Sequence, residues 1–297
     1  NLSLERGQTV GLVGETGAGK TTTALGVMGL IPSPPGKVVS GEILFEDKDL
    51  LKMSAKEMRK VRGKKISMIF QDPMTALNPV LTVGDQITEV IKLHEKCSSL
   101  EAAAKAKEML EMVGIPAERF SEYPHQFSGG MKQRVVISIA LACRPEVIIA
   151  DEPTTALDVT IQAQVLELMT KLKKEIQTSM ILITHDLGVV AEICDKVAIM
   201  YAGEIIEFGD LKAIYDNTAH PYTIRLFGAI PDLEKDVDRL EPILGLMPDP
   251  SNLAPGCRFC PRCANRKPIC ETTPPPEVEV TPGHMVKCHL YKEGGLA

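Results

Sequence analysis

Residues 14–21 read Gly14-Glu15-Thr16-Gly17-Ala18-Gly19-Lys20-Thr21, between an apolar run at residues 9–13 and a predicted helix at residues 20–30. In such a loop, glycines let successive backbone N–H groups turn inward around a phosphate, and the N-terminus of the following helix favours an anion. Lys20 can supply a positive charge to the β- and γ-phosphates of a nucleotide, and the Thr21 hydroxyl can bind Mg²⁺. A chance glycine-rich turn is the alternative. The position directly after an apolar run favours a phosphate-binding loop.

A pair of acidic residues ends a second apolar run. Asp151 and Glu152 follow residues 147–150, whose sequence is typical of a buried strand. Ligands of open parallel sheets gather at the carboxyl ends of the strands. There Asp151 can hold Mg²⁺ through water, and Glu152 can orient or deprotonate an attacking water. The alternative is a pair of exposed acids at a strand end.

Two more predicted strands end in polar side chains. Gln71 follows residues 66–70, and His185 follows residues 180–184. A glutamine there can contact Mg²⁺ or the attacking water, and a histidine can contact the γ-phosphate. The alternatives are a surface glutamine and a structural histidine.

A second glycine-rich helix start lies at Ser128-Gly129-Gly130, with Phe127 before it and Met131 after it. A hydroxyl and bare backbone amides at a helix N-terminus suit an oxyanion. The alternative is an ordinary serine N-cap. With two anion-binding helix starts but one set of hydrolytic residues, the chain is predicted to share its site with a second, similar chain.

The order of these motifs resembles the ATP-binding-cassette (ABC) ATPases over roughly residues 1–215. It continues with Ala156-Leu157-Asp158 and Thr184-His185-Asp186. The resemblance implies a head-to-tail dimer that holds ATP between Lys20 of one cassette and Ser128 of the other, with Asp158 at the dimer seam. It also implies that the loop of Gln71 senses membrane subunits. The motif at residues 127–131, Phe-Ser-Gly-Gly-Met, has a form that is typical of peptide-importer cassettes.

The resemblance implies a full set of site residues. The expected catalytic residues are Glu152, His185 and Gln71. The expected nucleotide-binding residues are Gly14, Glu15, Thr16, Gly17, Ala18, Gly19, Lys20, Thr21, Thr22, Gln71, Asp151, Ser128, Gly129, Gly130 and Asp158. The expected Mg²⁺ ligands are Thr21, Gln71 and Asp151.

Strands that alternate with helices predict an α/β fold, with a mostly parallel, RecA-like P-loop core. A hairpin at residues 197–208 adds an antiparallel part. The helix-only stretch at about residues 82–142 is expected to form an inserted helical subdomain of a nucleotide-binding domain at residues 1–215. Residues 216–297 are expected to form a loop-rich extension without a core of its own.

Five cysteines in the extension make up a cluster at residues 257–288. The Cys-x-x-Cys-x-x-Cys run at residues 257–263 is like that of a ferredoxin. Four thiolates also suit Zn²⁺, whereas disulfides fit poorly with a cytosolic nucleotide enzyme. A metal here would act as a structural staple.

The extension itself resembles that of the oligopeptide, dipeptide and nickel importer ATPases, at residues 220–223, 229–231, 256–263 and 286–289. Some members resemble iron–sulfur proteins, which implies a 4Fe–4S cluster. The ligands that the resemblance implies are Cys257, Cys263, Cys270 and Cys288, with Cys260 as an alternative ligand.

The composition restricts which classes of partner the chain can have. The net charge of −6 argues against a general nucleic-acid binder, and the chain contains no apolar run of about 18 residues that would span a membrane. The resemblance implies a second ATPase subunit, identical or homologous, two transmembrane permease subunits and an extracytoplasmic solute-binding protein. The expected location is the cytoplasmic face of the membrane and the expected cargo is peptide, with nickel or another small solute as the alternative. A soluble, non-transport ABC ATPase and an iron–sulfur regulatory protein are further alternatives.

Overall fold

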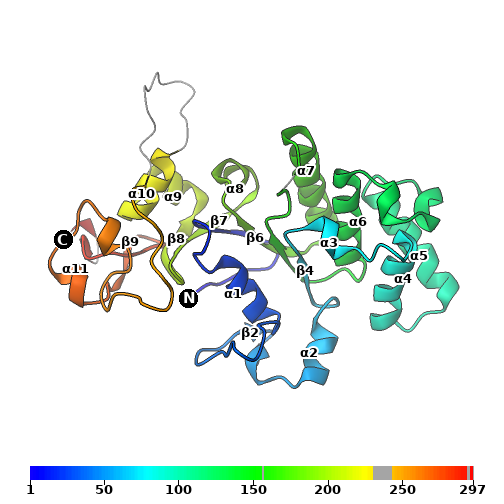
Figure 1. Cartoon of the computed structure of the whole chain (residues 1–297), viewed down its shortest axis with the longest axis horizontal. Helices are drawn as coiled ribbons and strands as arrows, with labels where there is room; N and C mark the ends of the chain where they lie inside the picture. Colours follow the sequence, from blue (N-terminus) through cyan, green and yellow to red (C-terminus); the bar gives the residue numbers. More distant parts are fainter. Residues whose placement is uncertain (156, 230–242, 293–294, 297) are drawn as a thin grey trace. The chain divides into compact units, whose positions relative to one another are not determined.

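The computed structural model describes residues 1–155, 157–229, 243–292 and 295–296. These residues fold as two compact units (Figure 1). The first unit comprises residues 1–3, 10–20 and 184–297, and the second comprises residues 4–9 and 21–183. The phosphate loop thus belongs to the same unit as the C-terminal extension. The proposed boundary between residues 215 and 216 stays a prediction.

Three parallel strands form the centre of the second unit. They are β4 (Ile66–Ile69), β5 (Val147–Asp151) and β6 (Ser179–Thr184), with β5 between the other two. Apart from Val147 and Ile181, which are half-buried, every residue of these strands is buried, as the apolar runs predict. The register aligns Asp151 with Ile183. Both acidic residues therefore lie at the carboxyl end of the central strand.

The helices of this unit begin where the sequence places caps. The capping boxes are complete in α2 (Ala55–Val61) and α5 (Ser99–Met112), and Thr82 caps α4 (Val83–His94). The helices α4 and α5 pack against each other and against α6 (Gly129–Leu141), as Figure 1 shows. The helices predicted at about residues 82–142 are therefore confirmed.

The helix after the phosphate loop is shorter than expected. It runs over α1 (Lys20–Val27) and ends before the predicted limit at residue 30. Gly29 has φ +58°, and the Leu30 N–H bonds the Leu25 carbonyl at 2.8 Å. A glycine in the left-handed conformation ends a helix in this way because it carries no Cβ.

The first unit has its own strands. The strand β1 (Thr9–Val13) runs parallel to β7 (Lys196–Tyr201), which forms the predicted antiparallel hairpin with β8 (Glu204–Asp210). The turn residues Ala202 and Gly203 have φ +46° and +83°. The antiparallel part of the fold is confirmed, and it lies beside the strand that leads into the phosphate loop.

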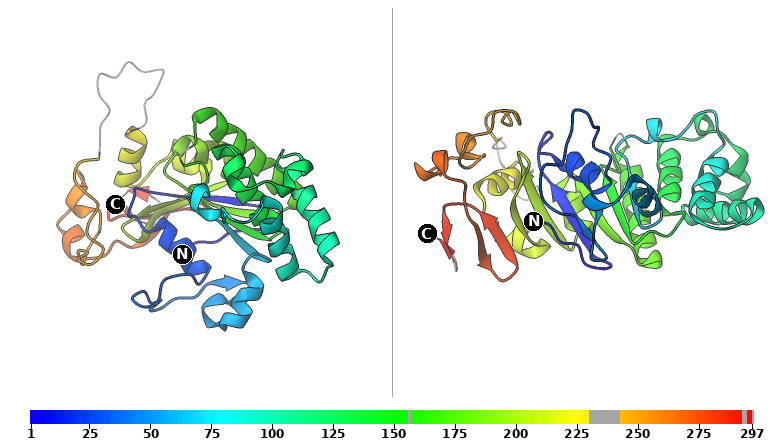
Figure 2. Two further views of the ribbon diagram at one scale, coloured as in Figure 1. Left: turned by 45° about the vertical axis from the view of Figure 1, so that its right-hand side comes forward. Right: turned by 90° about the horizontal axis from the view of Figure 1, so that it is seen from below.

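The extension is more regular than the expected coreless tail. Its strands β9 (Glu277–Thr281) and β10 (His284–Lys287) pair with each other, and β10 pairs with β8 (Figure 2). Ala219, Val286 and Cys288 are buried together there. The alternation of Glu and Val in β9 is an ordinary strand pattern, which the prolines before it obscure.

The described residues contain further elements. They are β2 (Leu44–Phe45), β3 (Lys48–Asp49), η1 (Leu50–Lys52), α3 (Pro73–Ala76), η2 (Ala117–Ser121), η3 (Pro124–Gln126), α7 (Val159–Ile176), α8 (Leu187–Ile193), α9 (Leu211–Asp216), α10 (Pro221–Gly228), η4 (Cys260–Arg262), α11 (Ile269–Thr272), β11 (Tyr291–Lys292) and β12 (Gly295–Leu296).

Candidate nucleotide site

The glycines of the phosphate loop are required by its backbone. Gly17 and Gly19 have φ +86° and +101°, a region that residues with a Cβ rarely adopt. A Cβ at Gly14 would lie 2.2 Å from the Met200 carbonyl oxygen. The loop therefore turns tightly against β7.

Lys20 lies within this loop. Its side chain is buried, and Nζ donates to the carbonyl oxygens of Gly14 at 2.6 Å and Glu15 at 3.2 Å. The Ala18 carbonyl accepts a bond from the Gly203 N–H at 2.7 Å. The ammonium group is held at the loop and the loop is fixed to the β7–β8 turn, an arrangement that suits the binding of a phosphate.

Gln71 and Glu152 meet at the ends of β4 and β5. Gln71 Nε2 donates to Glu152 Oε2 at 2.9 Å, and the Thr155 hydroxyl donates to the same oxygen at 3.0 Å. Two donors on one carboxylate oxygen fix the orientation of the carboxylate. Thr155 did not emerge from the sequence, where threonines next to an acidic pair carry no distinct signal.

Glu152 also has an unusual backbone. Its φ is +45°, while its N–H bonds the Ile183 carbonyl at 2.8 Å. A non-glycine residue in this conformation costs about 1–3 kcal/mol, and such strain clusters at functional sites. Glu152 is half-buried, whereas Asp151 at the end of β5 is only 2% exposed.

The expected Mg²⁺ ligands have suitable chemistry. Thr21, Gln71 and Asp151 offer hydroxyl, amide and carboxylate oxygens, the hard donors that Mg²⁺ binds. Thr21 and Thr22 form the first turn of α1. The donor set fits the ion, and its assignment stays a prediction.

Ser128 and Asp158 act as helix caps. Ser128 Oγ accepts a bond from the Met131 N–H at 3.4 Å, and Asp158 Oδ1 accepts one from the Ile161 N–H at 3.0 Å. A Cβ at Gly130 would lie 2.4 Å from Ile161 Cγ2, so close helix packing requires this glycine. The role of Ser128, Gly129, Gly130 and Asp158 toward a second chain's nucleotide stays a prediction, and Ala156 lies outside the described residues.

His185 follows β6, as predicted, and its side chain is exposed. The next residue, Asp186, caps α8 by accepting from the Gly188 and Val189 N–H groups. A contact of His185 with the γ-phosphate stays a prediction.

The five cysteines of the extension line one small cavity of about 10 Å³. All five are free thiols, and burial raises the pKa of four of them, that of Cys288 to about 11. The Lys267 N–H lies 3.4 Å from Cys270 Sγ. In the described part of the chain, no group of three or more His, Cys, Asp or Glu side chains is placed to hold a metal ion. The thiols therefore line one cavity, but the structure does not show a metal cluster there.

Two residues of the extension that were not among the predicted site residues contact the phosphate loop. The Glu15 N–H donates to the Tyr222 hydroxyl at 3.1 Å, and Arg262 pairs with the Glu15 carboxylate at 3.1 Å. The contact of Arg262 joins residues 247 positions apart. A contact between residues so far apart in the chain leaves no local pattern in the sequence.

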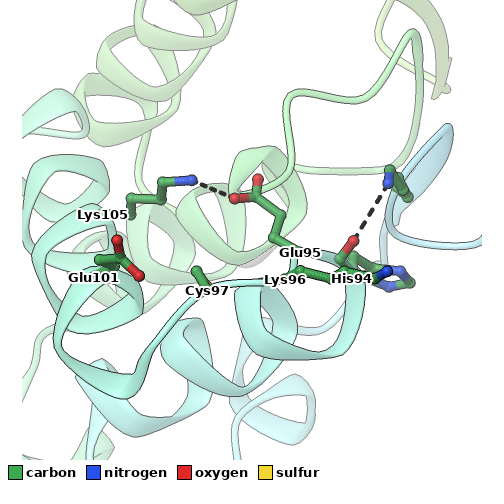
Figure 3. Close-up of a pocket in the computed structure, with 7 residues that line it drawn as sticks. His94, Glu95, Lys96, Cys97, Glu101 and Lys105 are labelled. Carbon is green, nitrogen blue, oxygen red and sulfur yellow. Dashed lines mark hydrogen bonds and ion pairs between the residues drawn. The ribbon is translucent and has the colours of Figure 1, made fainter.

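A larger surface pocket, of about 590 Å³, contains none of the predicted site residues (Figure 3). Glu95 and Lys105 form an ion pair there, and Lys64 Nζ donates to the His94 carbonyl at 3.3 Å. Volume alone thus does not locate the nucleotide site.

Comparison with known proteins agrees with this geometry. Residues 1–155 match the ABC transporter family, and residues 206–270 match the C-terminal region of oligopeptide/dipeptide transporters. The oligopeptide transport ATP-binding protein AppD of Bacillus subtilis is 51% identical, over 99% of this chain and 90% of its own length. The oligopeptide transport ATP-binding protein OppD of Escherichia coli is 47% identical, over 97% and 85%. The ATP-binding cassette MJ0796, in a dimeric post-hydrolysis state bound to ADP and Pi, is 29% identical with a TM-score of 0.63, over 71% of this chain and 88% of that one.

The fold, the phosphate loop and the acidic pair define a P-loop ATPase of the ATP-binding-cassette type. The chain belongs to the ABC transporter ATPases, and within them to the oligopeptide/dipeptide branch. None of the helices in the described residues has the length and apolar character needed to cross a membrane.

Proposed function

We propose that this chain hydrolyses ATP to power the import of di- and oligopeptides through partner permease subunits. The observation that carries the proposal is the match of its extension to that of oligopeptide/dipeptide transporters, joined to relatives at about half identity that are named for peptide transport. Import of nickel or another small solute is the alternative within the same family.

In this proposal the chemical step depends on Glu152. Its carboxylate accepts a proton from the attacking water while the water oxygen bonds to the γ-phosphorus and ADP leaves. Gln71 and Thr155, which donate to Glu152 Oε2, keep the carboxylate in one orientation. His185 contacts the γ-phosphate, and residues 14–22 hold the phosphates with Lys20 as the cation. Mg²⁺, when bound at Thr21, Gln71 and Asp151, supplies positive charge to the β- and γ-phosphates.

The proposal includes partners. A second ATPase subunit, identical or homologous, places its Ser128-Gly129-Gly130 and Asp158 against the ATP held at Lys20. Two permease subunits dock near Gln71, and an extracytoplasmic solute-binding protein delivers the peptide. The chain then lies at the cytoplasmic face of the membrane as a peripheral subunit. The dimeric form of the cassette named above supports the first of these partners.

Glu152→Gln tests the chemical step. The variant keeps the shape of the side chain but cannot accept the proton, so ATP turnover should fall by about 10²–10⁴-fold while ATP binding persists. The measurement is phosphate release by the assembled transporter, with and without peptide. Glu175→Gln is a matched control because Glu175 lies at the far end of α7, in an exposed pair with Lys171. Wild-type turnover of Glu152→Gln would show that this residue is not the general base.

A second proposal concerns the cysteine cavity. We infer that four of its thiols hold a 4Fe–4S cluster, with Zn²⁺ as the alternative, because the five cysteines of residues 257–288 line one small cavity. Such a site would stabilise the extension. Iron, sulfide and zinc analysis of anaerobically purified protein decides between the two metals, and metal-free protein would refute both. Cys263→Ser should lower the metal content, whereas Cys97→Ser, outside the extension, should not.

A further inference from the structure

The extension contacts the phosphate loop through a buried arginine. Arg262 is the last residue of the short helix η4, and its side chain is only 6% exposed. Nη1 and Nη2 bond the two carboxylate oxygens of Glu15 at 3.1 and 3.2 Å. Two parallel bonds between a guanidinium and a carboxylate make a strong and directional ion pair.

The position of Arg262 is fixed independently of Glu15. Its Nε donates to the Leu244 carbonyl at 2.9 Å, and Nη2 donates to the Ile243 carbonyl at 3.3 Å. The guanidinium also lies 5.8 Å from the centre of the Tyr201 ring and 3.4 Å from its hydroxyl. The arginine is therefore a preorganised cation to which the loop carboxylate binds.

Glu15 makes several of the contacts that fix the phosphate loop. Its N–H bonds the Tyr222 hydroxyl at 3.1 Å, and its carbonyl accepts from Lys20 Nζ at 3.2 Å and from the Ala18 N–H at 3.1 Å. The residue that pairs with Arg262 thus also helps to hold Lys20. Its negative charge lies in a loop that has to bind a polyphosphate, and the two anions repel unless the carboxylate is neutralised.

We propose that Arg262 is a positioning residue for ATP: it neutralises Glu15 and holds the phosphate loop ready for the nucleotide. The C-terminal extension then sets the ATP affinity of the cassette, in addition to any role in the transporter. The inference rests on the proposed function insofar as the loop binds ATP.

The test is equilibrium binding of a fluorescent ATP analogue with Mg²⁺ to the full chain. Arg262→Gln should weaken binding about tenfold, because one unneutralised charge then faces the bound polyphosphate. Arg262→Lys keeps the charge but loses the paired bonds, and should weaken it about two- to threefold. Arg266→Gln is the matched control, since it removes the same charge from an exposed position of the same segment. With ATP in excess, kcat of Arg262→Gln should stay near wild type while KM rises.

The decisive variant is the double substitution. Glu15→Gln in the Arg262→Gln background removes the repelling charge and should restore binding to within about threefold of wild type. If Arg262 had only a structural role, the second substitution would not restore ATP binding. Glu15→Gln alone should bind at least as tightly as wild type, which keeps the test open even where Arg262→Gln fails to fold.

The proposal is overturned by unchanged binding in Arg262→Gln, by a double variant as weak as the single one, or by weaker binding in Glu15→Gln alone. Failure of the wild-type chain to bind the analogue would instead count against the proposed function. The two failures are thus distinguishable in the same titration.

Discussion

Phe259→Ala should destabilise the first unit strongly. Phe259 is 2% exposed and packs edge-on against Tyr201 and Tyr222, with ring centroids 5.2 and 5.4 Å away, and its ring lies 5.8 Å from that of His220. Replacing a buried phenylalanine by alanine costs about 3–5 kcal/mol, and the lost aromatic contacts contribute to that cost. We expect the free energy of unfolding to fall by about 4 kcal/mol.

The loss can be measured in urea. With a slope of about 3 kcal/mol per molar urea, the midpoint should fall by about 1 M. The chain contains five tyrosines and no tryptophan. Its intrinsic fluorescence is therefore tyrosine emission, to which Tyr201 and Tyr222 contribute, and circular dichroism follows the helices in parallel.

Two further variants calibrate the result. Phe259→Leu keeps most of the buried volume and should cost about 1–2 kcal/mol, and Leu246→Ala, at a side chain that is 91% exposed, should cost less than about 0.5 kcal/mol. A midpoint for Phe259→Ala equal to that of Leu246→Ala would refute the argument that this buried ring stabilises the first unit.

Two other predictions follow from the same unit. Burial lowers the pKa of His220 from 6.5 to about 4, against a smaller opposing effect of Glu207. Below pH 6.5 the unfolded chain therefore binds a proton at His220 that the folded chain does not bind. The free energy of unfolding should fall by about 2 kcal/mol between pH 7 and pH 5. Urea midpoints across this range should depend less on pH in His220→Asn, which keeps a helix cap, and equal slopes would contradict the assignment. Gly14→Ala should weaken ATP binding more than about tenfold, since its Cβ would lie 2.2 Å from the Met200 carbonyl. Gly228→Ala, where a Cβ meets nothing within 4 Å, should bind ATP as wild type does, and equal binding by both variants would refute the steric argument.

Local chemistry made much of this fold predictable. Apolar runs followed by polar residues gave β5 and β6, because buried parallel strands need continuous apolar sequence and place ligands at their carboxyl ends. Ser54 with Glu57 and the turn at residues 202–203 are signals of the same local kind. Such features depend on residues within a few positions of one another.

Other features depend on residues that meet only after folding. The left-handed backbone of Glu152 occurs together with its N–H bond to the Ile183 carbonyl on the neighbouring strand. The pairing of Arg262 with Glu15 requires the extension to fold back beside β7. Neither contact leaves a signal in the composition or spacing around the residues that make it. Glu152 could be predicted from its position after an apolar run, whereas the contact of Arg262 could not.

Ser128 illustrates how a structural and a functional interpretation can both hold. Its Oγ accepts from the Met131 N–H at 3.4 Å, a long bond that uses one lone pair. A hydroxyl that caps a helix still has a proton to donate, and the cap fixes its direction at the helix N-terminus. Asp158 similarly uses one carboxylate oxygen for its cap, at 3.0 Å from the Ile161 N–H. Capping is therefore compatible with the proposed role of these side chains toward a nucleotide on a partner subunit, and an ordinary N-cap is no evidence against that proposal.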